Sequence, residues 1–148
     1  MCSYCGCEAE PVVNTLMDDH AAIGVQARRI TEELDDRHFH RAEELVAELA
    51  GFFDHHARME EAGLFAQLRR AGEATEEVDR LVGEHRRLLG GLRRPDVAEG
   101  PHELRTLLMD LLRHAEVEDT DLFPFAMQVL PNPSWDMAEQ AHQLLLTT

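Results

Sequence analysis

Aromatic residues make up only 5% of this 148-residue chain, and valine, isoleucine and threonine are also sparse. Leucine, alanine, glutamate and arginine dominate instead, and this composition favours helices over β-strands. No apolar run approaches the roughly 20 residues that span a bilayer, so we expect no membrane partner. Residues 1–11 lack the basic start and the apolar stretch of a signal peptide, and we therefore expect a cytoplasmic protein.

Positive charge is also scarce. Fourteen basic residues face 29 acidic ones, which leaves a formal net charge of -15 at pH 7. A basic surface able to neutralise many phosphates is not available, so we expect no nucleic-acid partner. The sign of the charge suits a metal or a small cationic partner, although part of the acidic excess simply keeps a helical protein in solution.

The hydrophobic periodicity predicts an all-α fold, an up-down antiparallel four-helix bundle with a short C-terminal fifth helix. Residues 1–13 are expected to form a cysteine-containing tail and residues 14–148 the bundle. Thr75 and Ser134 are expected to cap helices, and Pro124 is expected to kink one. The expected helices cover about residues 14–35, 39–71, 75–92, 101–129 and 134–145.

One ten-residue word occurs twice, at residues 56–65 and 114–123, and reads H-x-x-x-E-[E/D]-x-x-L-F. With nine histidines in so acidic a chain, about one H-x-x-x-E pair arises by chance, so the bare spacing is a weak signal. His40 and Glu44 have this spacing without the Leu-Phe ending, and we assign them to a solvated helix face. The extended word is much less probable twice by chance.

The histidines of both words fall on the apolar stripes of their expected helices, and so do His20 and His85. Positions i and i+4 share a helix face, and imidazole with carboxylate suits iron, manganese or zinc. A histidine on such a stripe is often only a hydrogen-bonded core residue. Four histidines and two glutamates on converging stripes would, however, be a costly core without a metal. The predicted ligands are His20, His56, Glu60, His85, His114 and Glu118.

Several neighbouring residues admit two interpretations. Glu61 and Asp119 could supply ligands, but each lies one residue off the inward position, which favours surface acids. His55 could exchange with His56 after a small helix rotation, although the spacing to the glutamate favours His56. Gly24, one turn after His20, either leaves space beside the metals for a diatomic ligand or permits close helix packing. The histidines expected at the surface are His38, His102 and His142.

The chain resembles the hemerythrin-like family, the HHE cation-binding domain, over about residues 14–127. The residues that carry the resemblance are Asp19-His20-Ala21-Ala22-Ile23, both copies of the ten-residue word, Glu84-His85, and Pro124 after the second copy. The resemblance implies two iron ions, non-haem, with carboxylate and oxo or hydroxo bridges. By position, His20 and His56 would bind one iron, His85 and His114 the other, and Glu60 and Glu118 would bridge them.

The chain departs from true hemerythrins at Leu89, where they have a second histidine one turn after the third-helix ligand. The loss of an imidazole leaves an open position for water, peroxide or a substrate, and argues against simple reversible oxygen carriage. We therefore expect a protein that binds or reduces oxygen, hydrogen peroxide or nitric oxide, as an enzyme or without turnover. The alternatives are an oxygen or redox sensor, an iron-buffering protein, and a structural bundle held by a metal such as zinc. The redox partner is left open.

Cys2, Cys5 and Cys7 form a C-x-x-C-x-C cluster near the start of the chain. In the cytoplasm they are expected to be reduced thiols rather than a disulfide scaffold. Three thiols so close together could bind a soft metal or exchange disulfides, and a redox or persulfide role is the first functional interpretation. The other interpretation is an exposed tail with no fixed role.

Overall fold

The computed structural model describes residues 10–147, and in this range it contains helices and turns but no strand. The expected all-α class is therefore confirmed for these residues. Cys2, Cys5 and Cys7 lie outside the described residues. The elements are α1 (Pro11–Asp35), α2 (Phe39–Glu60), the π-helical turn η2 (Glu61–Phe65), α3 (Ala66–Ala71), α4 (Thr75–Arg93), α5 (Pro101–Val117), the π-helical turn η3 (Glu118–Leu122), α6 (Phe123–Val129) and α7 (Asn132–Leu146).

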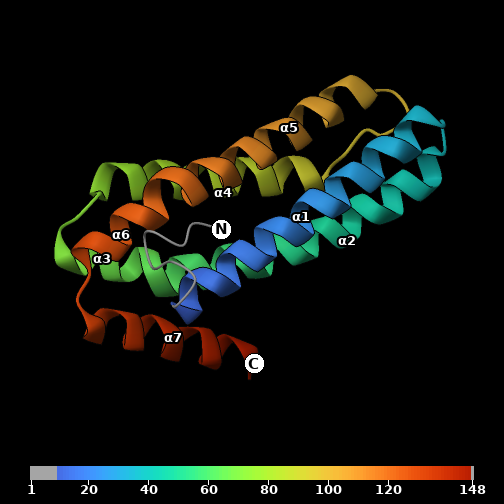
Figure 1. The fold of residues 1–148 in the computed structure, drawn as a ribbon. Coiled ribbons are helices and arrows are strands. Elements are labelled where there is room, and N and C mark those ends of the chain that lie inside the picture. The colour runs from blue at the N-terminus through green and yellow to red at the C-terminus, as the bar shows by residue number, and fades with distance from the viewer. Residues whose placement is uncertain (1–9, 148) are drawn as a thin grey trace.

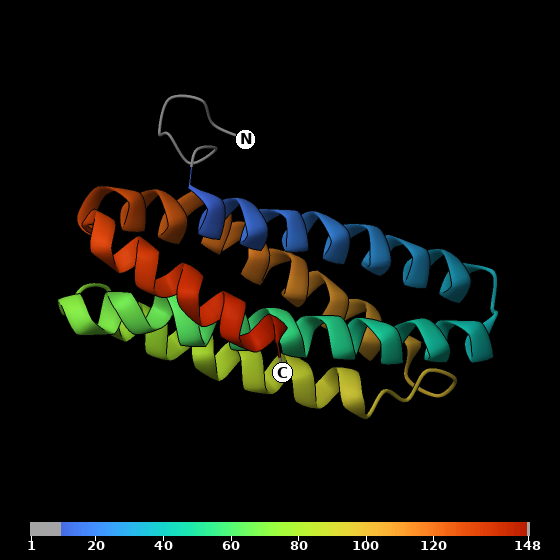
Figure 2. The same cartoon turned by 90° about the horizontal axis from the view of Figure 1, so that it is seen from below.

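The long helices form a bundle around a shared interior (Figure 1). Helix α1 packs on α2, α2 on α4, α4 on α5, and α5 again on α1. The C-terminal helix α7 lies outside this ring, below it in Figure 1 and across its near side in Figure 2. It packs on η2, α1 and α3. Among residues 10–147, no helix combines the length and the apolar character that crossing a membrane requires.

The apolar interior consists of two clusters. On α1, Leu16 belongs to one cluster and Ile23 to the other, and on α4 the same is true of Leu81 and Leu88. The polar residues that face inward lie between these positions on each helix, at His20 and His85. The bundle therefore has an apolar core on each side of one buried polar layer.

The two longest expected helices, residues 39–71 and 101–129, are each interrupted by a π turn within the repeated word. In the second copy the turn directly precedes Pro124, which lacks an N–H group and whose ring clashes with the carbonyl four residues earlier in a regular helix. The wider turn accommodates the proline, which then lies in the first turn of α6. In the first copy Gly63 occupies the turn and weakens the regular helix there.

Two expected helix starts and two expected caps are wrong, whereas α4 begins at residue 75 as expected. Helix α1 begins at Pro11 instead of residue 14, because proline suits the first helical position. The longer helix also buries Val12 and Val13. Thr75 is the first residue of α4, not its cap, and the preceding Ala74 has a φ of 51°. Helix α7 begins at Asn132, so Ser134 lies inside it and caps nothing.

Candidate metal centre

The structure brings all six predicted ligands together in the buried polar layer. They come from four sides of the bundle and are at most 6% exposed. Helix α1 supplies His20, α2 supplies His56 and Glu60, α4 supplies His85, α5 supplies His114, and η3 supplies Glu118. Helical spacing places the histidine and glutamate of each word on one face, as the sequence predicted.

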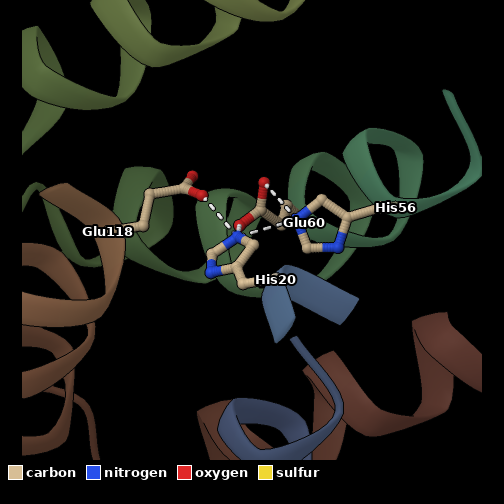
Figure 3. Close-up of side chains that lie close together, drawn as sticks. All are labelled: His20, His56, Glu60 and Glu118. Atoms are coloured by element: carbon tan, nitrogen blue, oxygen red, sulfur yellow. Dashed lines mark hydrogen bonds and ion pairs between the residues drawn. The ribbon is translucent and has the colours of Figure 1, made fainter. Parts of the chain in front are cut away.

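These residues form two groups that share both glutamates, and in each group the ligand atoms lie within 4.8 Å of one another. Glu60 Oε1 lies 3.3 Å from His56 Nε2 and 3.0 Å from His85 Nε2. Glu118 Oε1 lies 3.0 Å from His20 Nε2 and 3.5 Å from His114 Nε2. Each carboxylate therefore lies close to one histidine of each group. Figure 3 shows the group that contains His20 and His56.

Each of the four histidines also contacts a second carboxylate, through Nδ1 on the far side of its ring. The hydrogen bonds measure 2.7 to 2.9 Å. A carboxylate accepts, so each Nδ1 donates, and a neutral ring then directs the lone pair of Nε2 into the centre. The pairs are His20–Asp119, His56–Asp19, His85–Glu61 and His114–Glu84.

With neutral histidines, this arrangement leaves the Nε2 atoms and the glutamate oxygens, all hydrogen-bond acceptors, facing one another in the centre. His20 Nε2 and His56 Nε2 are 3.1 Å apart, and two neutral rings with protonated Nδ1 atoms would oppose their lone pairs there. Both oxygens of Glu60 and of Glu118 are buried without a well-oriented hydrogen bond. A cation between these atoms removes both problems, because every one of them is a donor of an electron pair. The residues therefore fit a bound metal cation.

The protonation of the metal-free layer follows the same logic. Burial opposes a charge on His20, but its hydrogen bond to Asp119 and the adjacent carboxylate of Glu118 outweigh this effect and raise its pKa to about 9. Burial likewise opposes a charge on His56 and His85, yet the carboxylates around them raise the pKa of each to about 10. In the metal-free layer, protons on these histidines thus balance the carboxylate charges that a bound cation would balance.

The pKa values of the other three residues of the layer shift in different directions. Burial, helped by the charge of Glu60, raises the pKa of Glu118 to about 8. Burial also opposes ionisation of Glu60, but His56 and His85 hold the pKa of that carboxyl well below its usual range. Burial lowers the pKa of His114 to about 4 in spite of the nearby glutamates.

The phenylalanine that ends each copy of the repeated word stacks on a candidate histidine. Phe65, from the first copy, stacks on His85 of the second half, with ring centroids 5.7 Å apart. Phe123, from the second copy, stacks on His20 of the first half at the same distance. Phe53 closes the other side of the layer, at 5.6 Å from His85 and 6.1 to 6.2 Å from the two histidines of the words.

The hydrogen bonds of the four outer carboxylates were not predicted from the sequence, which assigned Glu61 and Asp119 to the surface and left Asp19 and Glu84 without a role. Asp19 and Glu84 directly precede two candidate histidines, and this repeated acid–histidine pair was the available signal. Glu61 and Asp119 are partly exposed, with side chains 40% and 29% accessible, but each accepts a hydrogen bond from a candidate ligand. Their position in the word, directly after the inward glutamate, pointed to them.

The other histidines separate as expected with one exception. His55 is exposed while His56 is buried, and the His40–Glu44 pair lies on the surface, as do His38 and His102. His142 was expected at the surface but is only 4% exposed, because α7 packs its ring against Gly63. A Cβ added at Gly24 would meet nothing within 4 Å, so this glycine is not required for close helix packing. Gly24 lines a surface groove with Arg28 and Met109, and none of the six predicted ligands lines this groove.

Comparisons with known proteins place the chain in a family. No curated protein matches the chain, and no solved structure matches it. The family model of the hemerythrin HHE cation-binding domain matches residues 12–126. This range contains all six predicted ligands and both π turns. The chain therefore belongs to the hemerythrin HHE cation-binding domain family.

Proposed function

We propose that this protein is a non-haem di-iron protein that binds or reduces a small oxidant, namely oxygen, hydrogen peroxide or nitric oxide. The observation that carries the proposal is the sharing of two buried carboxylates, Glu60 and Glu118, between two pairs of histidines. Shared carboxylates with unsatisfied oxygens suit two adjacent ions better than one.

In this proposal His20 and His56 hold one iron, His85 and His114 hold the other, and the two glutamates bridge them. Nitrogen and oxygen donors of this kind suit iron. When bound, the iron pair supplies one-electron redox changes and open coordination positions for a small molecule. We take the long helices as an up-and-down antiparallel bundle, which the closed ring of packing contacts supports.

The chain's own residues set what reaches the centre. All six predicted ligands are at most 6% exposed, so bulk water is excluded from the layer. Phe53, Phe65 and Phe123 are at most 1% exposed and form part of its wall. Such a closed, apolar lining favours diatomic molecules and peroxide over larger substrates. Leu89, where hemerythrins have a histidine, is partly buried against the apolar core and supplies no ligand.

A second candidate function is a sensor or an iron-buffering protein without turnover. Among residues 10–147, all six carboxylates in or around the polar layer already have partners. Four accept hydrogen bonds from Nδ1 atoms and two lie between the histidine pairs. None of these six acids is left to deliver a proton to a reduced oxidant, and this favours binding over turnover.

Metal analysis tests the proposal first. Protein produced under iron-replete conditions should hold two irons per chain and show visible absorption in air. Zinc instead of iron would contradict both functions and favour a structural bundle. Hydrogen peroxide or nitric oxide is then added to the iron form in separate experiments. Steady consumption favours the oxidoreductase, whereas a stable spectral change without consumption favours the sensor or buffer.

A further inference from the structure

The four outer carboxylates form a closed ring around the bundle. Each long helical segment supplies one carboxylate to the histidine of the next segment, in the order α1, α2 with η2, α4, α5 with η3, and back to α1. The hydrogen bonds around this carboxylate ring are Asp19–His56 at 2.9 Å, Glu61–His85 at 2.8 Å, Glu84–His114 at 2.8 Å and Asp119–His20 at 2.7 Å.

Members of the carboxylate ring keep their charge at modest cost because their side chains are 22% to 40% exposed. A carboxylate on Nδ1 also fixes the orientation of a metal-binding imidazole and raises its basicity. The four histidines therefore offer stronger donors than free imidazole, which favours the more highly charged state of a bound ion.

The charges around the centre point the same way. Glu60 and Glu118 carry two negative charges when metal is bound, and the carboxylate ring carries four more. Two ferric ions carry six positive charges, whereas two ferrous ions carry four. Arg80 offsets one ring member, because its guanidinium lies 2.5 Å from Glu84. Within residues 10–147, no basic side chain other than histidine pairs with Asp19, Glu61 or Asp119.

We propose that the carboxylate ring holds the iron pair toward the ferric state, and that Asp19, Glu61, Glu84 and Asp119 are its positioning residues. This inference rests on the di-iron function proposed above. It gives each ring member an electrostatic role that goes beyond holding a histidine in place, so removing charge and removing structure have different consequences.

Asp119→Asn removes one ring charge while keeping the size of the side chain and one acceptor oxygen. The matched control is Asp121→Asn, which removes the same charge from an exposed residue of the same π turn that contacts no histidine. The midpoint potential of each full-length, iron-loaded protein is measured by anaerobic optical redox titration. Loss of one such partner lowers metal affinity by about 10–100-fold, and the part of this loss specific to Fe³⁺ is set at the low end, about tenfold. We expect the Fe³⁺ over Fe²⁺ preference of Asp119→Asn to fall by about this factor, equal to about +60 mV at 59 mV per tenfold. The control should stay at the wild-type potential.

Arg80→Gln supplies a variant of opposite sign. It uncovers the charge of Glu84 without touching a histidine, and its side chain is 50% exposed, so the fold is not at risk. We expect a lower midpoint potential than that of the wild type. Damage to structure alone would not move the two variants in opposite directions.

The outcomes separate this inference from the proposed function. A wild-type protein that binds no iron contradicts the proposed function and, with it, the inference. Two irons per chain at an unchanged potential in both Asp119→Asn and Arg80→Gln overturn only the inference. If Asp119→Asn loses iron, its Zn²⁺ affinity is compared with that of the wild type. A Zn²⁺ affinity within about threefold of the wild-type value supports a ferric bias, because the divalent ion is then still held. Equal loss of Zn²⁺ means that Asp119 acts by holding the structure and overturns the bias.

Discussion

Phe53 offers a direct test of how α2 is oriented around the polar layer. Its side chain is 1% exposed and contacts the rings of His56, His85 and His114, whereas its neighbour Phe52 is only half-buried. Helical spacing alone, three residues after Leu49 and four before His56, would instead place Phe52 inward. Truncating a buried phenylalanine to alanine costs about 3–5 kcal/mol, through lost burial and the cavity left behind. The half-buried Phe52 should cost about 1–2 kcal/mol.

Urea unfolding of the metal-free protein, followed by circular dichroism, measures both costs without the stability that bound metal adds. With a slope of about 2 kcal/mol per molar urea, Phe53→Ala should lower the midpoint by about 1.5–2.5 M and Phe52→Ala by under about 1 M. Phe53→Leu keeps most of the volume and should cost only about 1 kcal/mol. Equal costs for the two alanine variants, or a larger cost at Phe52, would show that the helix is rotated from the position described above.

Three further predictions concern the metal and the C-terminal helix. His56→Ala combined with His114→Ala should abolish iron binding while far-ultraviolet circular dichroism stays helical, and two irons per chain in this variant would refute the ligand assignment. Three histidines of the layer have pKa values raised to about 9–10, so metal must displace their protons at pH 7. Glu118, with a pKa raised to about 8, adds a fourth proton, so loading with Zn²⁺ in weak buffer should release about four protons. An indicator dye measures the release, and metal affinity should fall as pH falls; no release would contradict this. Gly63→Ala puts a Cβ 2.9 Å from His142 Nε2 and should destabilise by about 1–2 kcal/mol, whereas Gly83→Ala meets nothing and should stabilise by up to about 1 kcal/mol. Equal urea midpoints would exclude the clash.

The sequence predicted the fold class and the inward positions of the six polar residues because helical periodicity reports which face is buried. It chose His56 over His55 correctly, since only His56 aligns with Glu60 one turn later. The site residues stay predictions as ligands, although the structure brings them together.

What the sequence did not predict depends on contacts between distant segments. Asp119 reaches His20 across 99 residues, and no local period encodes such a hydrogen bond. The burial of His142 depends on where α7 docks, which is set by the missing side chain of Gly63 on another helix. The π turns escaped notice because the apolar stripe continues through them, as Leu64 shows by its burial four residues after Glu60.

The π turns also determine where the chain can change length. Such a turn holds one residue more than the α-helical turn it replaces. Removing a residue there leaves the flanking helices in register, whereas the same deletion elsewhere rotates everything downstream by about 100°. In η2 the exposed Ala62 is such a residue. A shortened turn would keep Leu64 in the core but would draw Glu61 away from the position from which it reaches His85. At these two turns a one-residue deletion therefore changes the set of acids around the centre and leaves the bundle itself intact.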